Sequence, residues 1–151
     1  MKNYEINNNT IALIKENSYT TKVLEDETEY LIENEISNII NDSCEFFGSS
    51  YKGRIKGSRK LINGKYKMPI IIEETMSLIF FPTTASECDT CMWISLNQIK
   101  SYSKDEQGSY VIIQDGRKIY VDISLGSLQN QIYRANMLKS AINNRKLNQN
   151  I

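Results

Sequence analysis

Short apolar and β-branched runs, separated by polar residues, fill the first part of the chain. Three of them, rich in Ile, Val, Tyr and Thr, occupy residues 10–15 (TIALIK), 19–24 (YTTKVL) and 29–32 (EYLI). Runs of this length and composition are typical of β-strands, and the Glu, Asn, Asp and Ser residues between them are typical of turns. The pattern predicts an antiparallel meander.

The spacing becomes helical at residues 35–47. Apolar side chains recur there every three or four positions, at Ile36, Ile39, Ile40 and Cys44. This period predicts a short amphipathic helix, and a glycine directly after it is a common end of a helix.

Strand patterns return in the second half of the chain. Ile70–Ile72 and Leu78–Phe81 are continuous apolar runs, as buried strands often are, and Pro82 ends the second because proline cannot donate to a sheet. The clearest pattern covers residues 93–102, 109–114 and 117–123, which we expect to form three consecutive strands. Between the last two, Asp115-Gly116 predicts a tight hairpin turn with both residues at positive φ.

The last periodic segment predicts a helix near residues 127–146. Its apolar positions, three or four residues apart, are Leu128, Ile132, Ala135, Leu138 and Ile142. Such a stripe packs one helix face on a sheet, and the polar end of the chain (NNRKLNQNI) is expected to fray. The predicted fold is therefore α+β, a single domain over residues 1–151 that is dominated by antiparallel sheet.

Length and hydropathy add little to this picture. A chain of 151 residues has the size of one domain. No apolar run is long enough to span a membrane, and the first residues lack the basic and apolar regions of a secretory signal, so we expect a soluble cytoplasmic protein.

The charges, in contrast, are strongly segregated although the formal net charge is zero. Residues 1–45 hold ten acidic residues and three lysines, whereas residues 46–72 hold seven lysines and arginines and no acid. An unbalanced cationic segment favours a polyanionic ligand. The alternatives are that these side chains are merely solvated, or that they bind an acidic partner, which could be the acidic first third of the same chain or of a second copy.

The conformation of the cationic segment is suggested by its glycines. The sequence FFGSSYKGRIKGSRK covers residues 46–60, and Gly48, Gly53, Gly57 and Gly64 interrupt any long helix. We therefore expect an extended or hairpin ribbon with Lys and Arg on its turns. A thin, cationic ribbon suits the narrow minor groove of AT-rich DNA, where Arg54 and Arg59 are the candidates for entry.

Catalytic and metal chemistry have little support. There is no histidine, and we find no nucleophile elbow, P-loop or dinucleotide fingerprint. Cys88 and Cys91 form a C-x-x-C pair with Cys44 as the remaining cysteine, one ligand short of the four that structural zinc requires unless a carboxylate serves. We expect reduced thiols, no cofactor, no metal and no enzymatic activity.

The residues in this region resemble a known family. SCEFFGSSYKGRIKGS, residues 43–58, strongly resembles the signature block of the ComK family of competence transcription factors. Three further segments agree in order and approximate spacing, FFPT at 80–83, CMWIS at 91–95 and NQIYRANMLK at 130–139, and NNTIALI at 8–14 is a looser match.

The resemblance implies an activator of DNA-uptake and recombination genes. It implies binding to AT-rich boxes mainly through the minor groove, assembly as pairs of dimers on double-stranded DNA, a nucleoid location and contact with RNA polymerase. The signature matches are Ser49, Ser50, Tyr51, Gly53, Arg54 and Gly57. Charge alone adds Lys52, Lys56, Arg59, Lys60, Lys65 and Lys67 to the predicted DNA-binding residues.

Some residues have an alternative role. For Tyr51 and Tyr66 the alternative to base or sugar contact is ordinary packing. Trp93 and the helix containing Asn130–Leu138 are expected in the core or at an interface between protomers. The family continues into a C-terminal extension that is linked to activation and to a proteolytic adaptor, so for a chain of this length adaptor control and full activation are open.

Overall fold

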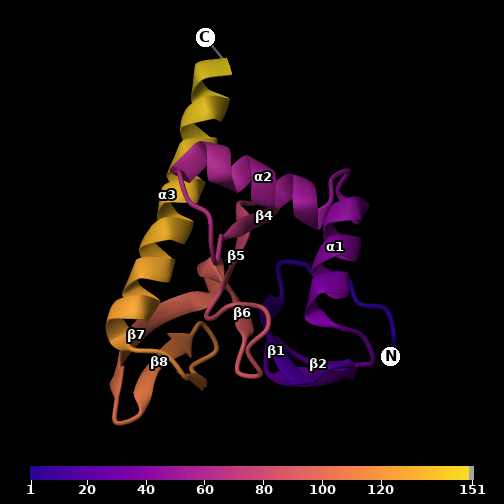
Figure 1. Ribbon diagram of the computed structural model, residues 1–151, viewed down its shortest axis with the longest axis vertical. Coiled ribbons are helices and arrows are strands. Elements are labelled where there is room, and N and C mark those ends of the chain that lie inside the picture. Colours follow the sequence, from indigo (N-terminus) through magenta and orange to yellow (C-terminus); the bar gives the residue numbers. More distant parts are fainter. Residues whose placement is uncertain (150–151) are drawn as a thin grey trace.

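Two antiparallel sheets and three α-helices build the part of the chain that the computed structural model describes, residues 1–149 (Figure 1). In chain order the elements are β1 (Thr10–Asn17), β2 (Thr20–Glu25), β3 (Thr28–Ile32), α1 (Ile36–Phe46), α2 (Tyr51–Ile62), β4 (Ile70–Glu73), β5 (Leu78–Pro82), β6 (Met92–Ser95), the 3-10 helix η1 (Leu96–Gln98), β7 (Ile99–Asp105), β8 (Gly108–Ile113), β9 (Lys118–Val121) and α3 (Leu125–Gln149). The predicted α+β class with a dominant antiparallel sheet is confirmed.

The larger sheet has six strands in the order β3-β2-β1-β6-β5-β4. The predicted meander of β1, β2 and β3 is confirmed, and so are the buried strands β4 and β5. Neighbouring residues such as Phe80 and Phe81 are both buried, because the sheet is covered on both faces. This double burial explains the continuous apolar runs in its central strands.

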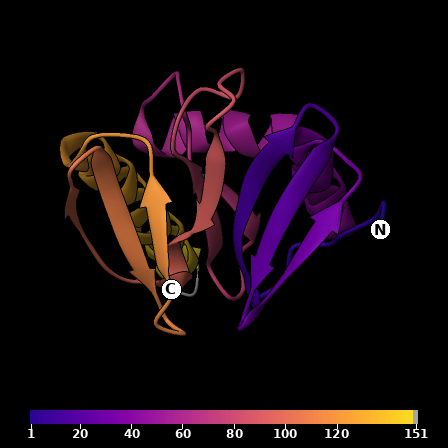
Figure 2. The same cartoon turned by 90° about the horizontal axis from the view of Figure 1, so that it is seen from below.

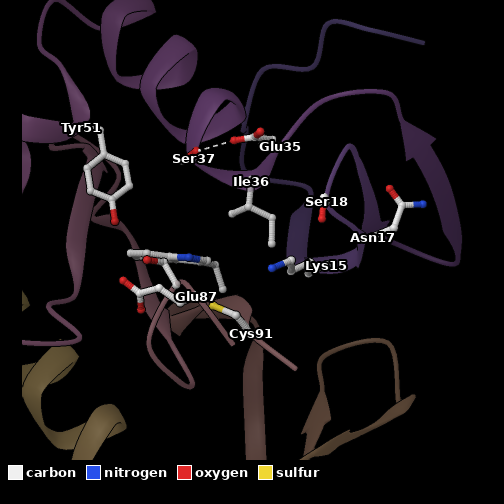
Figure 3. A pocket seen from close by; sticks show the side chains of 11 residues that line it. Lys15, Asn17, Ser18, Glu35, Ile36, Ser37, Tyr51, Glu87 and Cys91 are labelled. Atoms are coloured by element: carbon white, nitrogen blue, oxygen red, sulfur yellow. Dashed lines mark hydrogen bonds between the residues drawn. The ribbon is translucent and has the colours of Figure 1, made fainter. Parts of the chain in front are cut away.

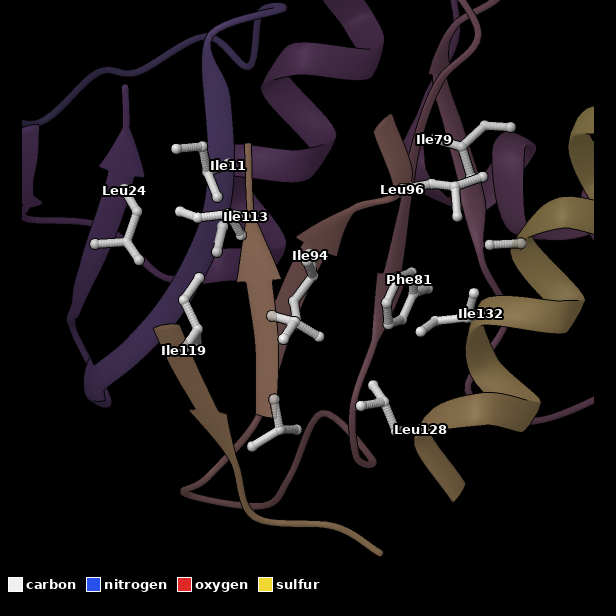
Figure 4. Close-up of a cluster of buried hydrophobic side chains, with 14 of the residues drawn as sticks. Ile11, Leu24, Ile79, Phe81, Ile94, Leu96, Ile113, Ile119, Leu128 and Ile132 are labelled. Carbon is white, nitrogen blue, oxygen red and sulfur yellow. The ribbon is translucent and has the colours of Figure 1, made fainter. Parts of the chain in front are cut away.

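Two hydrophobic clusters lie on the two faces of this sheet. On one face, Leu13, Phe80 and Trp93 pack with Ile39 and Ile40 of α1. On the other, the smaller sheet and α3 supply the cover, and Figure 4 shows Phe81 and Ile94 close to α3 and the smaller sheet. The helix α1 and the first half of α2 thus cover one face, and the smaller sheet with α3 covers the other. The end of α2, at Leu61 and Ile62, packs against the second cluster and contacts α3.

The smaller sheet contains β7, β8 and β9, and Figure 2 shows it beside the larger one. The predicted hairpin of β8 and β9 is confirmed. The strand predicted at residues 93–102 is wrong in one respect, because η1 splits it between the two sheets. Asn97 Nδ2 donates to the carbonyls of Met76 and Ser77, so this amide holds the bend against the turn between β4 and β5, which is remote in sequence.

The turn between β8 and β9 also differs from the prediction. Gly116 has a φ of 93°, but Asp115 is not among the residues at positive φ. The Gly116 amide donates to the Ile113 carbonyl, and the Ile113 amide donates to the Arg117 carbonyl. The loop is therefore one residue longer than the two-residue turn that was expected, with glycine in its left-handed position.

The helices predicted at 35–47 and near 127–146 are confirmed as α1 and α3. The polar end that was expected to fray is helical through Gln149, and Lys146 Nζ donates to the Glu74 carbonyl 2.6 Å away; the last two residues of that segment lie outside the described part of the chain. No helix within residues 1–149 is both long and apolar enough to cross a membrane.

The extended ribbon predicted for the cationic segment is wrong, because Tyr51–Ile62 form the α-helix α2 (Figure 1). Ser50 caps its first turn by accepting from the Gly53 amide, and Asn63 ends it in the left-handed conformation. Tyr51 and Ile55 pack against the cluster below α1. Each interior glycine costs a helix about 1 kcal/mol, and burial of the apolar face offsets that cost.

Candidate nucleic-acid interface

The helix α2 separates its apolar and cationic side chains onto two faces. Its inward positions are Tyr51, Ile55, Ser58 and Ile62, which recur every three or four residues. Its exposed cations recur with the same period, at Lys52, Lys56, Arg59 and Lys60. We call these four side chains the cationic row. Residues three and four apart share one helix face, so the row runs along the solvent side of α2 over about 12 Å.

Carboxylates do not neutralise the row. Within residues 1–149, Arg54 is the one cation of residues 46–72 that lies within 4 Å of an acidic group. The acidic first third of the chain forms α1 and β1–β3 instead of covering α2. The alternative in which this acidic segment folds back as a salt-bridged cover is therefore not observed in the described chain.

Arg54 lies apart from the cationic row. Its side chain is 17% exposed, and its Nη1 pairs with Glu74 Oε1 at 3.1 Å. Its Nε is buried without a hydrogen-bond partner. This arginine ties α2 to the turn between β4 and β5, so a contact with DNA would require it to leave Glu74.

Lys65 and Lys67 extend the cationic surface beyond the end of α2. Both side chains are exposed, on the segment that connects α2 to β4. Arg59 Nη2 donates to the Lys65 carbonyl at 3.0 Å, which holds the start of this segment against α2. The structure thus brings together six of the predicted cations, four on α2 and two beside its C-terminal end.

The remaining predicted residues have clear roles in the fold. Ser50 is the helix cap, and the Ser49 amide donates to the Cys44 carbonyl at 2.9 Å. Tyr51 packs edge-on against Trp93, with 6.0 Å between ring centroids, and burial raises the pKa of its hydroxyl. Trp93 is 3% exposed, as expected for a core residue.

A pocket of about 330 Å³ lies beside the start of α2 (Figure 3). Tyr51 points toward the side where Glu87 and Cys91 lie, and Lys15 lies on the opposite side of the pocket from Tyr51. The Lys15 ammonium is 3.6 Å from the Asp89 carboxylate. Because acidic and basic groups are mixed here, the pocket lacks the concentrated positive charge of the cationic row.

The cysteines are free thiols in this structure. Cys88 is exposed, whereas Cys44 and Cys91 are buried. Burial raises the pKa of Cys44 to about 11 and also raises that of Cys91, so both thiols are protonated and unreactive near neutral pH. No group of three or more Cys, Asp or Glu side chains within residues 1–149 is arranged to hold a metal ion.

Sequence reasoning missed the side chains that hold the segment after α2. Gln131 and Arg134, both on α3, donate hydrogen bonds to its backbone carbonyls. These contacts join residues more than 60 positions apart, so no local pattern could reveal them. The resemblance covered both residues but assigned them to the core or a protomer interface.

Fold and surface together define a class of protein. The chain is an α+β protein with a dominant antiparallel sheet, and within the described residues its helix α2 presents to solvent a row of cations without carboxylate partners. This arrangement is suited to polyanions such as nucleic acids. Comparison with known proteins identifies the family. A family model described as ComK protein matches residues 1–147, and the chain belongs to this family.

A curated relative agrees with that assignment. The competence transcription factor of Bacillus subtilis (strain 168) is 30% identical over 149 residues, which is 96% of this chain and 78% of that protein. Membership of the family supports a role as a competence transcription regulator. No solved structure matches the chain significantly.

Proposed function

We propose that residues 1–151 form a single DNA-binding domain that regulates the transcription of competence genes. The observation that carries the proposal is the cationic row on α2, exposed and free of carboxylate partners within the described chain. The ComK family assignment and the name of the relative support the same conclusion.

The cationic row is suited to the phosphates of a duplex. It spans about 12 Å, and double-stranded DNA carries one negative charge per ~1.7 Å of its axis, so the row can face several phosphates at once. Each neutralised phosphate releases counterions, and four or five contacts give a slope of log K against log salt of roughly −4.

The finer features come from the resemblance. They are a preference for AT-rich boxes, binding largely through the minor groove, assembly of dimers in pairs, a nucleoid location and contact with RNA polymerase; control by a proteolytic adaptor stays open. The ribbon argument for the minor groove no longer applies, because α2 is a helix about 10 Å across with its side chains. We retain the proposal that the Arg54 side chain enters the minor groove of the DNA.

The test is a gel-shift titration of the purified protein. An AT-rich duplex with paired boxes and a GC-rich duplex of equal length are compared at increasing salt. We expect retardation of both at low salt, a tighter complex with the AT-rich duplex, and affinity that falls steeply as salt rises. Equal binding of the two duplexes would refute the AT preference.

Matched charge reversals assign the interface. Lys56→Glu removes a central cation of the cationic row, whereas Lys104→Glu makes the same change at an exposed site in β7. We expect a large loss of affinity for the first variant and a small one for the second. Failure of the unaltered protein to bind any duplex at low salt, together with binding to an acidic protein, would replace the proposal with protein docking.

A further inference from the structure

The segment Gly64–Met68, between α2 and β4, presents three consecutive exposed side chains. Lys65 and Lys67 flank Tyr66, whose side chain is one of the most exposed aromatic groups of the described chain at 80%. Lys67 has a φ of 48°, a conformation that residues other than glycine seldom adopt. Packing does not explain why an aromatic side chain is exposed between two lysines on a backbone of uncommon conformation.

Side chains of two helices hold this segment by its backbone. Arg59 of α2 donates to the Lys65 carbonyl at 3.0 Å, and Arg134 of α3 donates to the Tyr66 carbonyl at 2.9 Å. The Lys67 carbonyl accepts from Gln131 at 2.9 Å and from Arg134 at 3.0 Å. Three successive carbonyls are therefore fixed from the protein side, and the side chains between them are directed to solvent.

One of the side chains that make these contacts is buried in the core. Gln131 is 1% exposed, and the same Nε2 also donates to the Pro82 carbonyl at 2.7 Å. Gly64 allows the guanidinium to approach, because a Cβ added there would lie 2.9 Å from Arg134 Nη2. Hydrogen bonds from α3 therefore fix the backbone of this segment relative to the core.

A groove of about 300 Å³ lies between this segment and α2. Arg59, Lys65 and Lys67 supply three positive charges to its walls, against one negative charge from Glu87 in the loop after β5, and Tyr66 supplies an aromatic ring. Cations that bind phosphates, together with a ring that can stack on sugars and bases, are the components of sites for nucleic-acid strands.

We propose that the segment Gly64–Met68 is a second part of the nucleic-acid interface, in which the Tyr66 ring contacts the sugar and base edge of a nucleotide. Lys65 and Lys67 contact the flanking phosphates, and Arg134 and Gln131 are positioning residues that act through the segment. The inference rests on the proposed function and deepens it, since it names a contact that does not depend on charge.

The contact is tested with Tyr66→Ala, Tyr66→Phe and a matched control. An aromatic ring that stacks on an unpaired base strengthens binding by about fivefold to over a hundredfold. A ring that contacts the sugar and base edge of a duplex belongs at the low end of this range, so Tyr66→Ala should bind the AT-rich duplex about tenfold less tightly, with an unchanged salt slope. Tyr66→Phe keeps the ring and should retain most of the affinity. Tyr19→Ala removes a ring that is 77% exposed in the turn between β1 and β2, and it should have no effect.

The positioning role is tested by a double-mutant cycle. Arg134→Lys keeps the positive charge, but a lysine has one nitrogen and cannot donate to the Tyr66 and Lys67 carbonyls as the two guanidinium nitrogens do. We expect about a fivefold loss of affinity for DNA, and this loss should disappear in a Tyr66→Ala background. Thermal unfolding of each variant checks that the fold is intact. Equal losses in both backgrounds would overturn the positioning role.

The outcomes separate this inference from the proposed function. If the unaltered protein binds DNA and Tyr66→Ala behaves like Tyr19→Ala, the inference is overturned and the proposed function stands. If the unaltered protein binds no duplex, both are overturned. Tenfold loss for Tyr66→Ala with retention by Tyr66→Phe supports the inference.

Discussion

At the scale of single residues, exposure separates the cations of the cationic row, which are available to a ligand, from Arg54, which is held by a carboxylate. Lys60 lies on the cationic row, whereas Arg54 is mostly buried and pairs with Glu74. An exposed lysine can contact the phosphates of any DNA sequence. An arginine that is held in place distinguishes between sequences only if its position allows contact with a base. The two residues should therefore affect DNA binding in different ways.

Alanine substitutions measure that difference. Lys60→Ala should weaken binding to all duplexes similarly and make the salt slope about one unit shallower, because one phosphate contact is lost. Arg54→Ala should cost about 1 to 3 kcal/mol of binding to the preferred sequence if the arginine exchanges Glu74 for a base. Glu74→Gln is the control, since it frees Arg54 and should not weaken binding; equal losses on every duplex for both alanine variants would contradict the distinction.

A substitution of Trp93 tests whether this side chain is part of the core. The indole is 3% exposed and packs against Tyr51 at the start of α2. Trp93→Ala should lower the free energy of unfolding by about 3 to 5 kcal/mol, because it leaves a cavity in the cluster below α1 and α2. Chemical denaturation measures the loss, and unfolding at the denaturant concentration of the unaltered protein would show that the indole is not part of the core.

At the scale of elements, α2 shows tertiary packing overriding a local preference. Gly53 and Gly57 suggested an interrupted ribbon, yet the apolar period through Tyr51 and Ile55 is helical, and burial favours the helix. Arg59 and Lys60 lie in its last turn, where positive charge interacts favourably with the helix dipole. The helix thus orders the cations that the sequence placed close together.

Gly57 gives a direct test of this helix. A Cβ added at Gly57 meets nothing within 4 Å, so alanine fits without steric strain. Gly57→Ala should raise the free energy of unfolding by about 0.5 to 1 kcal/mol, because alanine loses less backbone entropy in a helix. Thermal unfolding followed by circular dichroism measures the gain, and a decrease in stability would argue against a helix at this position.

At the scale of the whole molecule, an ion pair in the turn between β8 and β9 forms hydrogen bonds to the larger sheet. The side chain of Asp115 is 4% exposed, its carboxylate is 2.8 Å from Arg117 Nη2, and it accepts from the Glu27 amide at 3.1 Å. Arg117 in turn donates to the Glu25 carbonyl at the end of β2. The hairpin of β8 and β9 is thereby fastened to the turn between β2 and β3.

This link predicts a dependence of stability on pH. Hydrogen bonding from Arg117 holds the pKa of Asp115 below its usual value, so the carboxylate stabilises the fold above about pH 4, the unfolded pKa, and this contribution is lost as the pH falls through the lower, folded pKa. Asp115→Asn should therefore lower the melting temperature at neutral pH, with a difference that shrinks in acid. The exposed Asp122→Asn is the control, and a difference that grows below pH 4 would contradict the assignment.

Local patterns in the sequence determined most of the secondary structure. The strands β1–β5 follow from short apolar and β-branched runs, the hairpin at Asp115-Gly116 from alternation with a turn signal, and the helices α1 and α3 from a period of three to four residues. All of these patterns depend on neighbours along the chain. The cluster of cations that suggested DNA binding is also a local property. These features were predictable because the residues that cause them are adjacent in sequence.

Contacts between remote residues decided the rest. Burial against the sheet made α2 a helix, hydrogen bonds from Asn97 to the turn before β5 divided one predicted strand between two sheets, and α3 fixed the carbonyls of Tyr66 and Lys67. Each depends on groups that are 20 or more positions apart and leave no local pattern. The sequence therefore placed the positive charges together, and only the tertiary structure decided which of them face solvent, in what row, and beside which aromatic ring.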